Sequence, residues 1–186
     1  MTVVRRRVIF TGPPGSGKTA VLTALSRTGV GVVAEAATDV IAEMQEHGQP
    51  EPWTDLSFTE RIVALQRQRQ LAADGEAIGV TAYDRSPMCT LALARYLAHP
   101  VGPLLHEELD RVKRENTYER TVLFVEPIGR IVATAARRIS YEDSLIFGDL
   151  HRKVYAEQGY TLVDLPPVSM EARVRLVMTM LAEGEK

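Results

Sequence analysis

The chain has 186 residues, of which 45% are hydrophobic and 25% are charged, and these proportions are ordinary for a globular protein. They exclude a disordered, a collagen-like and a coiled-coil chain, and the length fits one domain, or one domain with a small lid. The 22 basic and 24 acidic residues leave a net charge of −2. This balance argues against a general binder of nucleic acid or of anionic membranes, although it allows a local basic patch.

Three features of the sequence bear on the compartment. Cys89 is the single cysteine, so the chain forms no internal disulfide and a reducing compartment is expected. The basic N-terminus is followed by an apolar run of three residues that ends at Thr11, which is too short for the core of an export signal. No run approaches the roughly 18 apolar residues of a membrane span. We therefore expect a cytoplasmic protein.

Continuous apolar runs predict short strands, and such runs are typical of a sheet with both faces covered. In chain order the predicted strands are Val8–Thr11, Val32–Glu35, Ile78–Tyr83, Val122–Glu126 and Leu162–Leu165. The predicted helices are Lys18–Arg27, Ala36–His47, Phe58–Ala73, Pro87–Leu97, Pro103–Arg114, Tyr141–Glu157 and Ser169–Ala182. Because strands alternate with helices, we expect an α/β fold with a parallel sheet and right-handed crossovers.

Two helix starts carry capping signals. Ser57 and Glu60 have the S-x-x-E spacing of a capping box at the start of the helix Phe58–Ala73. In such a box the serine side chain bonds a backbone N–H of the first turn, and the glutamate reaches back to the backbone of the serine. Ser169 is expected to be the N-cap of the last helix.

The segment Gly12–Thr19, GPPGSGKT, matches the phosphate-binding Walker A pattern G-x-x-x-x-G-K-[ST] in full, between a predicted strand and a predicted helix. Glycines let successive backbone N–H groups form a nest for an anion, and the following helix adds its positive dipole end. Lys18 supplies a charge for the β- and γ-phosphates, and the Thr19 hydroxyl suits a Mg²⁺ shell. The alternative is a turn rich in glycine and proline that binds nothing.

The cofactors expected from this motif are ATP and Mg²⁺, with GTP left open as a donor. The residues expected to bind the nucleotide are Gly12, Pro13, Pro14, Gly15, Ser16, Gly17, Lys18, Thr19 and Ala20. A GTPase normally reads guanine through Asn-Lys-x-Asp, but the only asparagine, Asn116, is followed by Thr and Tyr. A ring-forming motor ATPase needs a C-terminal helical lid, for which about 20 residues after the last strand are too few. A small kinase or a small stand-alone switch remains.

Several patches of the sequence, spread over most of the chain, resemble the phosphate-loop nucleoside and nucleotide kinases. They are most similar to the small predicted ATPases grouped with the kinase domain of the nicotinamide-riboside kinases. The patches are GPPGSGKT, VVAEAA, AYDRSP, AARRIS and GYTLVDLPP…EARV. The resemblance implies a P-loop NTPase fold, with a five-stranded parallel sheet in the order 2-3-1-4-5 and a short arginine-bearing lid at about residues 129–142. It leaves the substrate open.

Asp84 and Arg85, in AYDRS, match an acid and arginine that end the strand beside the phosphate loop in the resembling kinases. By this resemblance Asp84 takes the proton of the acceptor hydroxyl or holds Mg²⁺, two roles that the sequence does not separate, and Arg85 grips the substrate or its phosphate. The alternative for Asp84 is an N-cap of the next helix. Glu35 matches an acid that reaches the acceptor, and its alternative is a partner for the dipole of the following helix.

Arg137 and Arg138 lie in the expected lid, within the predicted mobile loop Gly129–Ser140. A lid arginine can neutralise charge in the transition state while the lid excludes water. By its place before the helix at Tyr141, Arg138 is preferred to Arg137, and Arg130 is a weaker third candidate. The alternative for these arginines is a solvated charged face.

The acceptor pocket is expected to draw on the predicted mobile loop Gly48–Leu56 and on the helix after it. Trp53 could stack on a base or ring, or could cover the edge of the core. Arg61 lies on the helix that lines the acceptor site in the resembling kinases, with a solvated helix face as the alternative. The resemblance also implies that Pro-Pro-Val at residues 166–168 lies near the adenine. The four histidines have no metal-ligand spacing.

The first hypothesis is therefore an ATP-dependent kinase that phosphorylates a hydroxyl of a small, nucleoside-like metabolite. Its expected residues are Lys18, Asp84, Arg85, Arg137 and Arg138 for catalysis, Glu35, Trp53, Arg61 and Arg85 for the acceptor, and Thr19 and Asp84 for Mg²⁺. The second hypothesis is a switch that hydrolyses ATP slowly and signals to a protein partner. A nucleic-acid end kinase is a weaker third, disfavoured by the net charge. We expect a small-molecule acceptor and no nucleic-acid or membrane partner, and we leave homodimer formation open.

Overall fold

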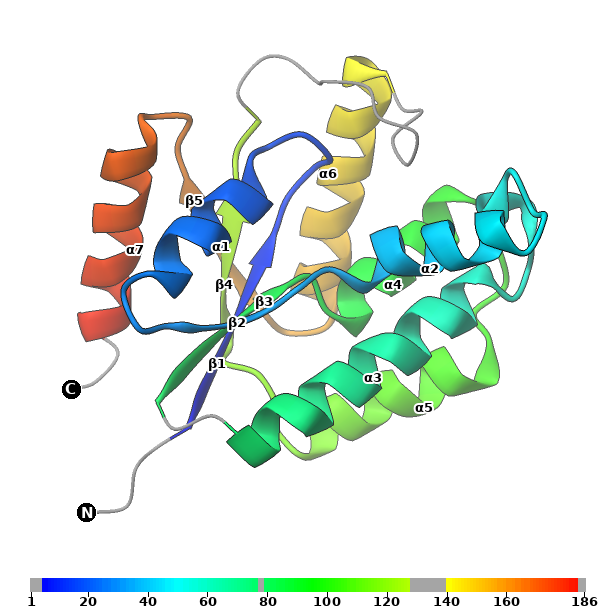
Figure 1. The fold of residues 1–186 in the computed structure, drawn as a ribbon, viewed down its shortest axis with the longest axis horizontal. Coiled ribbons are helices and arrows are strands. Elements are labelled where there is room, and N and C mark those ends of the chain that lie inside the picture. Colours follow the sequence, from blue (N-terminus) through cyan, green and yellow to red (C-terminus); the bar gives the residue numbers. More distant parts are fainter. Residues whose placement is uncertain (1–4, 77–78, 128–139, 184–186) are drawn as a thin grey trace.

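The structure is a computed structural model that describes residues 5–76, 79–127 and 140–183 (Figure 1). At its centre lies a five-stranded parallel sheet in the order β2-β3-β1-β4-β5, which confirms the order implied by the resemblance. The strands are β1 (Arg6–Thr11), β2 (Gly31–Val33), β3 (Val80–Asp84), β4 (Thr121–Val125) and β5 (Thr161–Leu165). The strand that leads into the phosphate loop is thus central, between β3 and β4.

Helices cover both faces of this sheet. They are α1 (Lys18–Ser26), α2 (Ala36–Glu46), α3 (Phe58–Glu76), α4 (Pro87–Tyr96), α5 (Pro103–Arg114), α6 (Tyr141–Glu157) and α7 (Met170–Glu183), and a 3₁₀ turn, η1 (Pro52–Thr54), precedes α3. Figure 1 shows α1 and α7 on one face, and α3 to α6 on the other. Alternate residues of a strand point to opposite faces. Accordingly Val8 and Phe10 of β1 pack with α1 and α7, whereas Ile9 packs with α4 and α6.

Each predicted helix and strand is present, and the bounds differ by a few residues. The expectation that both faces of every strand are covered holds for the centre of the sheet and is wrong at its two edges. Val32 of β2 is 36% exposed, and Thr161 and Asp164 of β5 are exposed. An edge strand has a neighbour on one side only, so the covering helices bury it less completely.

The two predicted helix caps have different outcomes. Ser169 is confirmed as the N-cap of α7, because its hydroxyl accepts a hydrogen bond from the Ala172 N–H at 3.3 Å. The prediction of a capping box at α3 is wrong, because the Glu60 carboxylate does not bond the backbone N–H of Ser57. Its carboxylate instead accepts hydrogen bonds from the N–H groups of Leu104 and Leu105, at 2.9 and 3.0 Å, in the first turn of α5. The side chain thus caps a neighbouring helix rather than its own.

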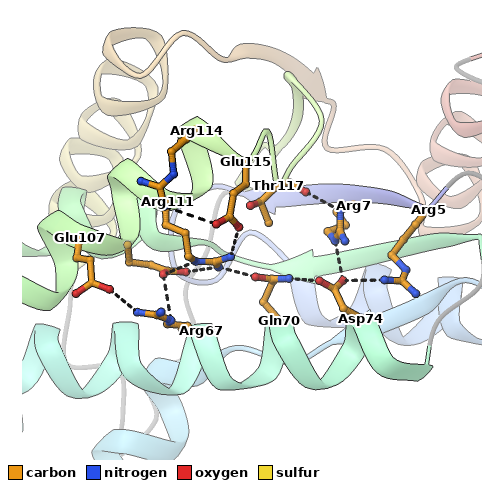
Figure 2. Close-up of polar contacts among 11 residues, drawn as sticks. Arg5, Arg7, Arg67, Gln70, Asp74, Glu107, Arg111, Arg114, Glu115 and Thr117 are labelled. Carbon is orange, nitrogen blue, oxygen red and sulfur yellow. Dashed lines mark hydrogen bonds and ion pairs between the residues drawn. The ribbon is translucent and has the colours of Figure 1, made fainter.

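A relay of hydrogen-bonded charged and polar side chains connects α5, α3 and the amino end of β1 (Figure 2). Arg111, with a side chain 9% exposed, forms a two-pronged ion pair with the fully buried Glu108 and donates a hydrogen bond to Gln70. Gln70 donates to Asp74, and Asp74 accepts from Arg7 of β1 at 2.8 Å. Buried charges are tolerated when paired and hydrogen-bonded, as they are here.

Within the described part of the chain, no helix combines the length and the apolar character that crossing a membrane requires.

Candidate active site

The phosphate loop connects β1 to α1, and the glycines at its two ends have backbone conformations that favour glycine. Gly12 has φ +135°, and a Cβ atom at this position would lie 2.4 Å from the carbonyl oxygen of Val125. Gly17 has φ +88° and is the N-cap of α1. Glycine reaches this left-handed region without steric cost. Because α1 begins at the next residue, its positive dipole end lies at the loop.

Lys18 is buried, and its ammonium group points back at the phosphate loop. It donates hydrogen bonds to the carbonyl oxygens of Gly12 and Pro13, at 3.0 and 2.9 Å, and lies 3.3 Å from the Ser16 hydroxyl. Burial and the nearby Arg85 guanidinium lower the pKa of Lys18 to about 7. An anion bound in the loop would favour the charged form of this lysine.

Thr19 and Asp84 meet at the carboxyl edge of the sheet. The sheet register pairs Asp84 with Phe10 of β1, and the Thr19 hydroxyl donates to Asp84 Oδ2 at 3.0 Å. The other carboxylate oxygen, Oδ1, is buried and has no hydrogen-bond partner among the described residues. Burial and the nearby Glu35 carboxylate raise the pKa of Asp84. Asp84 is not the N-cap of α4, since Ser86 occupies that position.

This pair of side chains fits a Mg²⁺ ion. The Thr19 hydroxyl and the Asp84 carboxylate, whose buried Oδ1 lacks a partner among the described residues, are hard oxygen ligands of the kind that Mg²⁺ prefers. The described residues contain no group of three or more His, Cys, Asp and Glu side chains that could hold a metal ion by themselves. A Mg²⁺ ion at Thr19 and Asp84 would therefore take most of its ligands from water and from phosphate oxygens, which is its usual habit.

Arg85 follows β3 and is held at several points. Its backbone has φ +77°, a conformation that non-glycine residues rarely adopt. Its Nε donates to Glu35 Oε1 at 2.5 Å, and its Nη1 lies 3.1 Å from His151 Nε2. Burial opposes the charge of this guanidinium, but the Glu35 carboxylate outweighs burial and the pKa of Arg85 is raised. The cation is therefore permanent and fixed in direction.

Glu35 occupies the N-cap position of α2, but its side chain makes no capping hydrogen bond. Its Oε2 accepts from the Thr38 hydroxyl at 2.9 Å, and Arg69 Nη1 donates to its backbone carbonyl at 2.8 Å. Burial alone would raise the pKa of the Glu35 carboxyl, but Arg85 and Lys18 outweigh it and the pKa is lowered. The carboxylate is thus ionised, and it pairs with Arg85 through one oxygen and with Thr38, in the first turn of α2, through the other.

A cavity of about 690 Å³ adjoins the phosphate loop. Apolar and aromatic side chains from α2, α3, α4, α6 and η1 form much of its wall, and Lys18, Thr19, Glu35 and Arg85 also line it. Asp84 does not line this cavity. It lines a smaller one, of about 410 Å³, together with Thr19 and Glu35. The two predicted carboxylates therefore share the smaller cavity, and only Glu35 also borders the larger one.

The structure brings Trp53 to the larger cavity and leaves Arg61 outside it. Trp53 is half-buried, lines the cavity and also packs against a cluster that includes Phe58. It covers the edge of the core, and its stacking on a base or ring stays a prediction. Arg61 is exposed and is not among the lining residues. The same helix instead contributes Ile62 and Gln66 to the wall.

Gln66 was not singled out as a site residue, although it lies one turn from Ile62 on the cavity side of α3. Its Oε1 accepts a hydrogen bond from the Thr90 hydroxyl at 2.8 Å, and both residues line the cavity. This bond fixes the amide at the wall. A polar pair among the apolar side chains of a wall is the kind of feature that orients a ligand.

Arg173 of α7 is another residue that the sequence analysis did not single out. It is 2% exposed and donates to three backbone carbonyl oxygens. These belong to Ser16 at 2.8 Å, Pro166 at 2.9 Å and Glu126 at 3.0 Å. Its position on the helix face that also carries the buried Val177 was a usable signal, since a charged residue on an apolar face must find partners inside the protein.

The predicted lid arginines, Arg130, Arg137 and Arg138, lie outside the described residues, as does most of the expected lid at residues 129–142. The described residues resume at Ser140, whose hydroxyl accepts a hydrogen bond from the Asp143 N–H at 3.0 Å and caps α6. The segment at 166–168 follows β5, and the carbonyl of Pro166 accepts hydrogen bonds from Arg173 and from the Val168 N–H. A contact of this segment with adenine stays a prediction.

The order of the parallel sheet, the glycine-framed loop between β1 and α1, and the acidic end of the adjacent β3 define a P-loop NTPase domain. A family model described as an AAA domain matches residues 7–173, and the chain belongs to that family. Among curated proteins, none matches the sequence.

Solved structures of deoxyadenosine kinase from M. mycoides have a similar fold. The form with the products dCMP and a flexible dCDP has a TM-score of 0.62 at 11% identity, over 95% of this chain and 99% of that one. The form with bound dATP has a TM-score of 0.58 at 13% identity, over 95% and 99% of the two chains. The form with bound dCTP has 0.59 at 13%, over 97% and 100%. At these identities the likeness shows the fold.

Proposed function

We propose that the protein is an ATP-dependent phosphotransferase that phosphorylates a hydroxyl group of a small, nucleoside-like molecule. The observation that carries this proposal is the cavity of about 690 Å³, because its wall combines the phosphate loop with apolar and aromatic side chains from several helices. A polyphosphate held by the loop would have a chamber for a second small molecule beside it, and the volume suits such a ligand. A switch that only hydrolyses ATP does not need this chamber.

On the donor side, we assign the polyphosphate to the backbone N–H groups of the phosphate loop and to Lys18. The ammonium group already lies within hydrogen-bond distance of the loop carbonyls of Gly12 and Pro13, so a small rotation would bring it to an anion above them. We assign Mg²⁺ to Thr19 and Asp84, because the unpartnered Asp84 Oδ1 suits a cation. Held there, Mg²⁺ would supply positive charge that offsets the negative charge of the polyphosphate and of the group in transfer.

On the acceptor side, we assign Glu35 and Arg85 to the reacting hydroxyl. Glu35 lines the chamber and Asp84 does not, which favours Glu35 as the acceptor's hydrogen-bond partner and leaves Asp84 to the metal. The lowered pKa keeps Glu35 ionised, so it can accept a hydrogen bond from the hydroxyl and orient the oxygen for attack. Arg85 would donate to an oxygen of the acceptor or of the transferred group.

The side chains in the wall of the chamber support an acceptor that contains a flat ring. Trp53, Phe58 and Phe147 offer aromatic surface, and Gln66 offers one polar contact among them. Aromatic walls with few polar groups suit a base or a similar ring. The similar fold of a deoxyadenosine kinase, which has been solved with dATP and with dCTP, points to the same class of acceptor. Arg137 and Arg138 remain the proposed source of positive charge from the lid.

A transfer assay tests this proposal. The protein is incubated with Mg²⁺ and ATP labelled at the γ-phosphate, and a panel of nucleosides and other small hydroxyl compounds is screened for label. We expect one acceptor class to become labelled by the wild type and by Lys153→Ala, an exposed change on α6, but not by Lys18→Ala. Label released only as inorganic phosphate, at a rate independent of every acceptor, would instead favour the switch.

A further inference from the structure

His151 of α6 is fully buried, and both of its ring nitrogens are hydrogen-bonded. Nδ1 lies 2.9 Å from the carbonyl oxygen of Phe147, one turn earlier on the same helix. Nε2 lies 3.1 Å from Nη1 of Arg85, which follows β3 in a different part of the fold. The imidazole therefore spans the space between α6 and the acceptor side of the proposed active site.

The two partners fix the protonation of this ring without further assumption. A carbonyl oxygen can only accept a hydrogen bond, so Nδ1 must carry a proton. A guanidinium nitrogen can only donate, so Nε2 must present its lone pair. His151 is thus a neutral acceptor toward Arg85, and a second proton on Nε2 would face the N–H groups of a cation. Its pKa is lowered well below the ordinary value, by burial and then by the charges of Arg85 and Lys18, in agreement with this geometry.

Arg85 is consequently gripped on two sides. Nε is bound by the Glu35 carboxylate and Nη1 by His151, and the backbone at φ +77° is one that needs surrounding contacts to persist. Among the described residues, Nη2 is the one nitrogen of this guanidinium that makes no hydrogen bond, while Arg85 lines the larger cavity. Both N–H groups of Nη2, together with the second N–H of Nη1, therefore remain as donors for a ligand.

We propose that His151 is a positioning residue that holds Arg85 Nη1 through its Nε2 lone pair, so that Nη2 is presented to the acceptor or to the phosphoryl group in transfer. This proposal rests on the proposed function for its catalytic consequence, but its structural part does not. If this position only filled space, an apolar side chain would do so at a lower cost in free energy. Burying an imidazole has a desolvation cost that its two hydrogen bonds must offset.

Three variants separate positioning from packing. His151→Leu fills the space without an acceptor, His151→Gln keeps an acceptor oxygen at similar reach, and His106→Gln changes a histidine of α5 whose side chain is 75% exposed. A lost hydrogen bond to a charged group predicts that His151→Leu lowers kcat for transfer about tenfold to hundredfold, with the ATP-induced rise in Tm unchanged. His151→Gln is expected within about threefold of the wild type, and His106→Gln equal to it.

A second measurement does not depend on activity. In ¹⁵N-labelled protein, the ring signals of His151, assigned by their loss in His151→Gln, should show a protonated Nδ1 and an unprotonated Nε2. The Arg85 Nε–H signal should shift in His151→Leu and stay in place in His106→Gln. An unshifted Arg85 signal in His151→Leu, or a Gln variant as slow as the Leu variant, would overturn the proposal. Absence of transfer by the wild type itself would refute the proposed function, and the ring and Arg85 signals would still decide the role of His151.

Discussion

Arg173 in the last helix donates a hydrogen bond of 2.8 Å from Nη1 to the backbone carbonyl of Ser16, which lies 157 residues earlier in the phosphate loop. The same guanidinium binds the carbonyl oxygens of Glu126, after β4, and Pro166, after β5. A planar fork of donors suits this task, because it reaches three acceptors from one rigid group. One buried guanidinium thus connects the phosphate loop with the segments that follow β4 and β5 at the carboxyl edge of the sheet.

We expect Arg173→Met to lower the free energy of unfolding by about 3 kcal/mol, because it leaves three carbonyl oxygens without their donor. The ATP-induced rise in Tm should also shrink, since Ser16 belongs to the phosphate loop. Urea unfolding and thermal shifts with Mg²⁺ and ATP measure the two effects. Arg175→Met, an exposed change on the same helix, is the matched control and should behave like the wild type. Equal stability of the two variants would show that Arg173 does not secure the loop.

Lys18→Ala should abolish stabilisation by nucleotide. A ligand that binds only the folded state raises its stability by mass action, so the rise in Tm with Mg²⁺ and ATP reports binding directly. The wild type and the exposed control Lys153→Ala should show the rise, and Lys18→Ala should not. A full ligand-induced shift in Lys18→Ala would remove this lysine from phosphate binding.

The variants Asp84→Asn and Glu35→Gln should distinguish a role in Mg²⁺ binding from a role in acceptor binding. Both changes should cut transfer by a factor of about 10² or more while ATP affinity stays within a few-fold of the wild type. Only Asp84→Asn should also raise the Mg²⁺ concentration needed for half-maximal rate, because Asp84 adjoins Thr19 and Glu35 lines the acceptor chamber. Rates at a series of Mg²⁺ concentrations provide the test. The same shift in both variants would contradict the division of roles.

The burial of His151 predicts a dependence of stability on pH. In the unfolded chain a histidine takes up its proton near pH 6.5, whereas burial and the charges of Arg85 and Lys18 hold the pKa of folded His151 well below that value. As pH falls below 6.5 the unfolded state binds more protons than the folded state, so the free energy of unfolding falls. Between about pH 7.5 and about pH 5.5, His151 alone contributes a loss of at most about 1.4 kcal/mol.

His151→Gln lacks this proton, so its free energy of unfolding should fall less than that of the wild type over the same range, by at most about 1.4 kcal/mol. Urea titrations at each pH measure the difference. His106→Gln, exposed on α5, should follow the wild type. Parallel curves for wild type and His151→Gln would mean that His151 titrates normally in the folded protein.

The contact between Glu60 and the first turn of α5 predicts a further effect on stability. A Cβ at Gly102 would lie 2.3 Å from the Glu60 side chain, so Gly102→Ala should displace the carboxylate that caps α5. We expect Gly102→Ala and Glu60→Ala each to lower the free energy of unfolding by about 1–2 kcal/mol, and the double variant to lose less than the sum. Gly75→Ala is the control, because nothing lies within 4 Å of its added Cβ. Additive losses would argue against a shared cap.

The phosphate loop could be predicted from sequence because local backbone geometry dictates its residue types. Gly12 and Gly17 adopt positive φ, and Lys18 and Thr19 follow at the start of the helix. The place of Asp84 at the carboxyl edge was predictable for a similar reason, since the end of a strand beside β1 is a fixed position in a parallel sheet.

Side chains that depend on distant partners could not be predicted. Glu60 has the spacing of a local capping box, but its acceptor oxygens meet a helix start 44 residues later, at Leu104. Arg61 and Gln66 lie on different sides of one helix, and the packing of that helix on its neighbours decides which side meets the cavity. His151 has no motif around it, because its role depends on Arg85, which is 66 residues away.

The relay that runs from Arg111 through Gln70 and Asp74 to Arg7 fastens the amino end of β1 to two helices (Figure 2). Proteins open locally where few buried contacts hold the backbone, and amide hydrogen exchange follows this order. The backbone at the amino end of β1 should therefore be among the slowest parts of the domain to exchange its amide protons. A nucleotide could then enter and leave through motions confined to one end of the domain.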